Sequence, residues 1–347
     1  MRRLVFRMVI VMLALGIFLS ATGPAKAATS AEELYKGQTL KFLVPFRPGG
    51  GFDAYARALM PYIKKYSGAA NVVIINKPGA GGNIAYNELF NTIKPDGLTI
   101  CLAQGETLAF NKLWDMEEAK YAPEEFTFLG RVVWEETCTL LGEKSSLKSV
   151  ADIKKAKLVK AACVALQDKS GTCVSAEFYA LGLDNLKKVV GYAGSREALA
   201  AALKNEADIA PGFSVGGIMK YVKAGSLIPL WIDANERHPR LPEVPTIYEL
   251  GVVKGHTGPI DLYVNALQLG RMIIAPPGMT KETYDLVEGI VAKAIKDPGY
   301  ATDLKKMKRD EPRFLEGQKS RALMQKVVKI TPAEKAELRE VVLKNAE

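Results

Sequence analysis

The chain has 347 residues, of which 48% are hydrophobic and 24% charged, fractions typical of a globular protein rather than of a disordered or collagen-like one. This length predicts about two domains. The formal net charge is +9, but residues 1–27 contain four basic residues and no acidic one, so the remainder carries only +5. Such a mild excess, without a dense block of basic and aromatic residues, disfavours nucleic-acid binding.

Residues 1–27 have the pattern of a secretory signal peptide and are not expected to belong to the fold. Three arginines precede an unbroken apolar run, residues 8–19, which is too short to span a bilayer comfortably. The segment ends in an Ala-Lys-Ala cleavage signal. We therefore predict that it is removed and that the mature protein is periplasmic; a retained anchor is the alternative.

From residue 40 the sequence alternates short apolar runs with helical patterns, which predicts α/β units built on parallel strands. Each of the first three strands is followed by a glycine-rich or polar segment that precedes a helix. The strands are expected at 40–44, 71–75 and 98–103, and the segments at 45–52, 76–83 and 104–107. Asp53 is expected to cap the first of these helices.

The middle of the chain repeats this order of elements. Strands are expected at 158–164, 188–192, 207–210 and 227–232, helices at 174–181 and 195–205, and loops at 167–172 and 211–217. Residues 254–270 fit no expected element. A further strand follows at 271–275, and Thr331 with Glu334 forms a capping box for the last helix.

The domain boundaries are expected near residues 131–140 and 232–242. Residues 28–132 together with 240–347 then form a discontinuous first lobe, and residues 133–239 form a second lobe. Two chain crossings between lobes suit a hinge.

Four cysteines, Cys101, Cys138, Cys163 and Cys173, are present, with no Cys-x-x-Cys spacing and only two histidines in the chain. A Cys/His metal site is therefore poorly supported, and we predict no metal and no cofactor. In an oxidising compartment one disulfide is plausible, with Cys163–Cys173 the first choice and Cys138–Cys173 the second. Buried free thiols are the alternative.

Glycine-rich segments that precede helices expose backbone N–H groups where the helix carries a partial positive charge, which favours anions. Residues 49–51 and 79–82 both qualify, although such glycines also serve as plain turns. Neither segment matches the nucleotide-binding P-loop or the dinucleotide fingerprint. No histidine follows a predicted strand end to activate Ser170, Thr172 or Cys173, so we predict no catalytic residue, with a secreted hydrolase as a minor alternative.

Three stretches resemble a known family: residues 44–53 (VPFRPGGGFD), 76–84 (NKPGAGGNI) and 95–99 (PDGLT). They are similar to motifs of the extracytoplasmic solute receptors of tripartite tricarboxylate transporters, the Bug family. Weaker similarities at 191–194, 240–246 and 275–278 extend the resemblance over nearly the whole mature chain. The family's usual G-S-T-S-H run is altered here at residues 170–174.

The resemblance implies an α/β, two-lobed periplasmic binding protein of the type II, Venus-flytrap class with two crossover strands. Such a receptor captures a small organic anion, a di- or tricarboxylate or an aromatic carboxylate, and delivers it to membrane transporter subunits; we expect a monomer. A sensory receptor that presents its ligand to a membrane kinase is the alternative. Arg47 is expected to face solvent. The candidate ligand-binding residues are Phe46, Gly49, Gly50, Gly51, Asp53, Gly81, Gly82, Gln104, Ser170, Thr172, Tyr192, Phe213 and Ser214.

Overall fold

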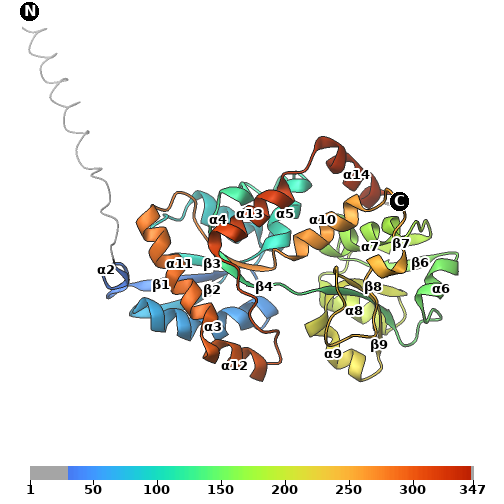
Figure 1. Cartoon of the computed structure of the whole chain (residues 1–347), viewed down its shortest axis with the longest axis horizontal. Helices are drawn as coiled ribbons and strands as arrows, with labels where there is room; N and C mark the ends of the chain where they lie inside the picture. The colour runs from blue at the N-terminus through green and yellow to red at the C-terminus, as the bar shows by residue number, and fades with distance from the viewer. Residues whose placement is uncertain (1–29, 345–347) are drawn as a thin grey trace, which may run out of the picture.

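The computed structural model of the protein describes residues 30–344, so the predicted signal peptide lies outside the described residues. The chain folds into two α/β lobes, each built on a five-stranded sheet (Figure 1). This arrangement agrees with the two lobes that the sequence predicts.

The first sheet has the strand order β2-β1-β3-β10-β4. Its strands are β1 (Thr39–Val44), β2 (Asn71–Asn76), β3 (Thr99–Gln104), β4 (Thr127–Val133) and β10 (Arg271–Ala275). Alternate residues of β1 and β3 enter two different apolar clusters, because successive side chains of a strand point to opposite faces. The sheet is therefore buried on both faces at its centre.

Helices of the first lobe cover these two faces. The cluster on one face includes side chains of α3 (Gly51–Ser67), α11 (Lys281–Lys296) and α12 (Pro298–Lys306). The cluster on the other face includes α4 (Asn83–Asn91), α5 (Gly105–Leu113) and α13 (Gly317–Val328). The short helix α2 (Ala31–Tyr35) precedes β1.

The second sheet has the order β7-β6-β8-β5-β9. It consists of β5 (Thr137–Gly142), β6 (Val159–Ala162), β7 (Leu186–Val189), β8 (Ile209–Ser214) and β9 (Leu227–Asp233), with helices α6 (Val150–Lys155), α7 (Lys169–Ala180), α8 (Ser195–Leu203) and α9 (Val215–Lys223). Both sheets contain antiparallel pairs beside the parallel ones that the sequence predicts. β10 runs antiparallel to both of its neighbours in the first sheet, and so does β5 in the second.

Three segments carry the chain between the lobes. The first joins β4 to β5, and the second leaves β9 and reaches β10 through α10 (Gly258–Leu267), which places the segment that fitted no predicted element. The third joins α13 to the C-terminal helix α14 (Pro332–Leu343), which packs against α7 of the second lobe and against α10 (Figure 1). The division at residues 132 and 239 stays a prediction. No helix among residues 30–344 has the length and apolar character needed to cross a membrane.

Three predicted boundaries differ in ways that affect the site. Helix α7 begins at Lys169 and not at 174, because Asp168 caps it and accepts the N–H of Gly171. Strand β8 continues to Ser214, so the predicted loop at 211–214 is wrong. Gly50, and not Asp53, is the N-cap of α3. The capping box at Thr331 is confirmed.

Candidate functional site

The loop between β1 and α3 is held by the carboxylate of Asp53. One oxygen accepts the N–H of Gly49 at 2.9 Å and the Arg57 side chain at 2.8 Å. The other accepts Asn76 Nδ2 at 3.0 Å, and the same amide donates to the carbonyl of Phe46. The hydrogen bond from Arg57 lowers the pKa of Asp53 to about 2. Asp53 therefore supports the loop as a charged group and is 3% exposed.

The beginning of α3 leaves backbone donors without partners. Gly50 supplies no side-chain cap, and the N–H groups of Gly51 and Phe52 have no acceptor among residues 30–344. The first N–H groups of a helix carry its partial positive charge and are satisfied by caps, water or ligands. This end of α3 can therefore bind an anion.

The second glycine loop precedes α4 and contacts the end of the third strand. Gly82 has φ +104°, and a Cβ there would lie 2.7 Å from the ring of Tyr86, so this position requires glycine. The hydroxyl of Tyr86 accepts the N–H of Gln104 at 3.0 Å. This bond joins α4, which follows the second glycine loop, to the end of β3 at the carboxyl edge of the sheet.

An ion pair joins the lobes at the start of α5. Glu106 Oε1 accepts Gln104 Nε2 at 3.0 Å and lies 3.3 Å from Nζ of Lys169, the first residue of α7 in the second lobe. Both side chains are largely buried, with 8% of the Glu106 side chain and 27% of the Lys169 side chain exposed. The N-termini of α5 and α7 therefore face each other across the boundary between the lobes.

Arg271 forms the wall beside the first loop. It begins β10 opposite Gln104, and its guanidinium lies over the rings of Phe52 and Tyr55, 4.8 and 4.5 Å from their centroids. It pairs with Glu135, which lies in the crossing between β4 and β5. Burial raises the pKa of Glu135, but the charge and hydrogen bond of Arg271, together with Asp310 and Lys169, outweigh burial and lower the pKa of that carboxyl. A largely buried arginine is thus fixed next to the crossing between β4 and β5.

A second contact between the lobes involves Asp310. Its carboxylate pairs with Arg240 at 2.9 Å, and a Cβ on Gly216, in the first turn of α9, would lie 2.5 Å from it. Burial raises the pKa of Asp310 to about 6, with the charge of Glu135 adding to the effect.

The structure places the first-lobe candidates along one edge of the first sheet. Phe46, Gly49, Gly50, Gly51, Asp53, Gly81, Gly82 and Gln104 lie where β1, β2 and β3 end. Arg47 is exposed. All these residues stay predictions as ligand contacts.

The candidate residues of the second lobe lie on several different elements. Ser170 and Thr172 lie in the first turn of α7, and the hydroxyl of Ser170 already bonds with Asp168 and with the N–H of Val164. Phe213 and Ser214 end β8. Tyr192 packs beside an alanine cluster of the second lobe. Their roles toward a ligand also stay predictions.

Sequence reasoning missed Glu106, Lys169, Arg271 and Glu135. Glu106 and Lys169 lie within polar segments that the sequence predicts, but no feature of the sequence indicates that the two residues form an ion pair. Arg271 and Glu135 lie at a strand end and in a crossing, and only the antiparallel insertion of β10 brings them together.

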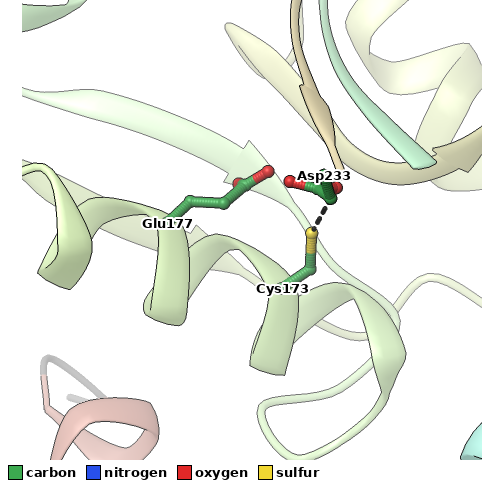
Figure 2. Close-up of side chains that lie close together, drawn as sticks. All are labelled: Cys173, Glu177 and Asp233. Atoms are coloured by element: carbon green, nitrogen blue, oxygen red, sulfur yellow. Dashed lines mark hydrogen bonds between the residues drawn. The ribbon is translucent and has the colours of Figure 1, made fainter. Parts of the chain in front are cut away.

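A buried acidic cluster lies in the second lobe, away from these loops. Cys173, Glu177 and Asp233 each offer an atom within 4.8 Å of the others, and all three are 0% exposed. In Figure 2 the two carboxyl groups point toward one another, and the Cys173 thiol donates to Asp233 at 3.6 Å. Glu177 Oε1 accepts hydrogen bonds from Thr139 and Trp231 at 2.6 and 2.7 Å.

One oxygen of each carboxyl group in this cluster has no partner. Thr137 donates to Asp233 Oδ2 at 2.6 Å, which leaves Oδ1, and Glu177 Oε2 is likewise buried without a hydrogen bond. Burial raises the pKa of both acids, and the Glu177 charge raises that of Asp233 further. One proton held between the two carboxyl groups satisfies both oxygens. The thiol sulfur and the carboxylate oxygens of these three residues are also atoms that can bind a divalent cation. The spacing of cysteines and histidines in the sequence does not reveal this group of residues.

The disulfide expectation is wrong. All four cysteines are buried free thiols, as in the alternative interpretation. Cys163 and Cys173 are not joined, and the thiol of Cys173 faces Asp233 instead.

Comparison with known proteins agrees with the fold and with the motifs. Residues 56–333 match the family described as tripartite tricarboxylate transporter family receptor. Protein BugT of Bordetella pertussis is 26% identical over 243 residues, which cover 68% of this chain and 72% of BugT.

Two solved structures share the two-lobed architecture. R. palustris Rpa4515 with adipate gives a TM-score of 0.68 at 20% identity, covering 88% of this chain and 97% of that one. MatC from Rhodopseudomonas palustris with bound malate gives 0.65 at 21% identity, covering 88% and 98%. Family and fold are those of solute-binding receptors, and the chain belongs to the tripartite tricarboxylate transporter receptor family, which includes the periplasmic Bug proteins.

Proposed function

We propose that the protein captures a small organic carboxylate between its lobes in the periplasm and delivers it to the membrane subunits of a tripartite transporter. The observation that carries this proposal is the beginning of α3, where the N–H groups of Gly51 and Phe52 lack acceptors beside the buried cation Arg271. Adipate and malate in two proteins of the same fold support a carboxylate as ligand.

Capture proceeds by closure of the two lobes over the ligand. The first lobe supplies backbone donors at the ends of β1 and β2, and the second lobe supplies the start of α7, whose Lys169 reaches Glu106. A ligand stabilises the closed state only through contacts that the open state lacks. Binding and release by this route need neither a covalent step nor a cofactor, and a monomer is sufficient.

Calorimetry of the mature protein against mono-, di- and tricarboxylates and aromatic acids tests the proposal. We expect at least one carboxylate to bind with a stoichiometry of one and a neutral sugar not to bind. If the sugars bind and no carboxylate does, the proposal is wrong.

A matched pair of variants ties binding to the first loop. Gly51→Asp places a carboxylate at the first position of α3, where it accepts the same N–H groups and repels an anion. We expect it to weaken carboxylate binding by at least about tenfold, since a lost hydrogen bond to a charged group is of that size. Gly289→Asp makes the same charge change in α11, where a Cβ meets no atom within 4 Å, and is the control. Equal affinities of the two variants would contradict the proposal.

A further inference from the structure

Glu106 has a carboxylate oxygen that the protein itself does not satisfy. The residue is 6% exposed, and both of its donors, Gln104 Nε2 and Lys169 Nζ, bond to Oε1. Oε2 is buried with no hydrogen-bond partner. A buried carboxylate oxygen without a donor is costly, so a donor is expected from outside the described chain.

The position of Glu106 directs this oxygen to the boundary between the lobes. Glu106 lies in the first turn of α5 after β3, at the same sheet edge as the two glycine loops. Lys169 reaches it from the opposite lobe, and the charge of Glu106 acts on Arg271 beside the first loop. Glu106 and the two glycine loops therefore share one edge of the first sheet.

The charges at this boundary are already balanced. Glu106 pairs with Lys169, and Glu135 pairs with Arg271, so these four side chains have no net charge. The start of α3 adds a partial positive charge suited to one carboxylate. Arg271 Nε is also buried without an acceptor, and it lies beside the start of α3, where the first carboxylate can accept it. A second carboxylate on the ligand meets the charge of Glu106. A positively charged donor meets the unsatisfied oxygen instead.

We propose that the ligand is an amino-carboxylate, a zwitterion whose carboxylate binds at the start of α3 and whose ammonium group donates to Glu106 Oε2. This inference rests on the proposed function and narrows its ligand class from organic acids in general. Glu106 is the residue that sets this specificity. Lys169 holds Oε1, which leaves Oε2 for the ligand.

Calorimetry with matched ligands of equal chain length tests the ligand class. Butyrate, 4-hydroxybutyrate, 4-aminobutyrate and glutarate have a hydrogen, hydroxyl, ammonium or carboxylate group on the fourth carbon. Butyrate, 2-hydroxybutyrate, 2-aminobutyrate and ethylmalonate have the same four groups on the second carbon, which gives the shorter spacing. In the series whose spacing fits, we expect the amino acid to bind at least about tenfold more tightly than the dicarboxylate, because only the ammonium gains a charged hydrogen bond.

Glu106→Gln separates the role of Glu106 from that of the loops. The carboxamide keeps the size of the side chain but removes its charge and can present a donor. We expect the variant to lose the preference for the amino acid over butyrate and over the dicarboxylate. Glu124→Gln is the matched control. Glu124 also pairs with a lysine, Lys112 at the far end of α5, and also has an unpartnered oxygen, but it lies within the first lobe.

The outcomes separate this inference from the proposed function. If no acid of these two series and no acid of the carboxylate panel above binds to the correctly folded protein, the proposed function is wrong, and the inference that rests on it is wrong as well. If dicarboxylates bind as tightly as amino acids, or if Glu106→Gln leaves the preference unchanged, the proposed function stands and the amino-carboxylate inference is overturned. Circular dichroism and thermal unfolding of each variant establish that it is folded.

Discussion

The free energy of unfolding is expected to fall as the pH rises, and Asp233→Asn is expected to remove much of this dependence. Burial raises the pKa of both Glu177 and Asp233, so the native pair keeps one proton that the unfolded chain has released. The native state then binds more protons than the unfolded state, and raising the pH favours unfolding. The pair makes its full contribution to the free energy of unfolding at pH values below the pKa values of the two acids in the unfolded chain. This contribution is lost progressively as the pH rises above them.

The magnitude follows from one proton. Unfolded Asp and Glu titrate near pH 4, and each proton retained on folding changes the free energy of unfolding by about 1.4 kcal/mol per pH unit. The pair therefore contributes a loss of this size for each pH unit above the unfolded pKa values over which it keeps the proton. In Asp233→Asn the amide donates to Glu177 and still accepts from Thr137, so it mimics the singly protonated pair without a proton to release.

Urea unfolding at pH 5, 6 and 7 measures this difference, with the fluorescence of the buried Trp231, which donates to Glu177, as the signal. Asp310, whose pKa is raised to about 6, contributes a dependence of the same sign in both proteins and cancels in the comparison. Asp184→Asn makes the same charge change at an exposed site of the second lobe and controls for net charge.

Two results would refute this reasoning. If Asp233→Asn and the parent lose stability with pH at the same rate, the pair does not hold a proton in this range. If a chelator lowers the unfolding midpoint of the parent but not of the variant, the cluster of Cys173, Glu177 and Asp233 holds a cation rather than a proton.

Three smaller changes have defined outcomes. Gly82→Ala is expected to lower the free energy of unfolding by about 1–3 kcal/mol in urea titrations, because φ is +104° and the new methyl meets Tyr86; an unchanged midpoint would contradict the geometry. Thr331→Ala, which removes the capping box with Glu334, is expected to cost about 1 kcal/mol by the same assay, whereas Thr331→Ser is expected to retain it. The four buried thiols are expected to resist Ellman's reagent until the protein unfolds, since burial raises their pKa; rapid reaction of the native protein would show that they are accessible.

The sequence predicts several strands of this protein but not their directions. Apolar runs give β10 with the bounds 271–275, and β1, β2 and β3 within one residue at each end, because an apolar run is a strong local signal, whereas the sequence does not predict β4 and β5. The antiparallel insertion of β5 and β10 depends on where the chain returns after crossing between the lobes, and no local pattern encodes this.

Glycine explains the error at α7. Gly171 predicts a loop when read locally, yet it lies within the first turn of the helix. A Cβ there would lie 2.3 Å from the carbonyl oxygens of Ala165 and Leu166, so the glycine permits a close approach of the chain and does not mark a turn. The candidate residues Ser170 and Thr172 were therefore assigned to the wrong kind of element.

The site is predictable only in part for a similar reason. Backbone donors at glycine loops follow from motifs, since a motif lies in one stretch of sequence. The ion pairs of Glu106 with Lys169 and of Glu135 with Arg271 join residues 63 and 136 positions apart. Their assembly requires the complete topology, and so does the pairing of Glu177 with Asp233.

Buried charge is neutralised in two different ways, and the difference bears on closure. Within the second lobe, where the acids of the Glu177 pair stay buried, a proton is expected to neutralise one of them. Across the boundary, Glu106 faces Lys169 from the opposite lobe, and both regain water when the lobes separate. Removing the two charges from water costs free energy, and the attraction between them offsets only part of this cost. Closure without a ligand therefore gains little from this ion pair, and a ligand that supplies the missing donor to Glu106 can determine which state is populated.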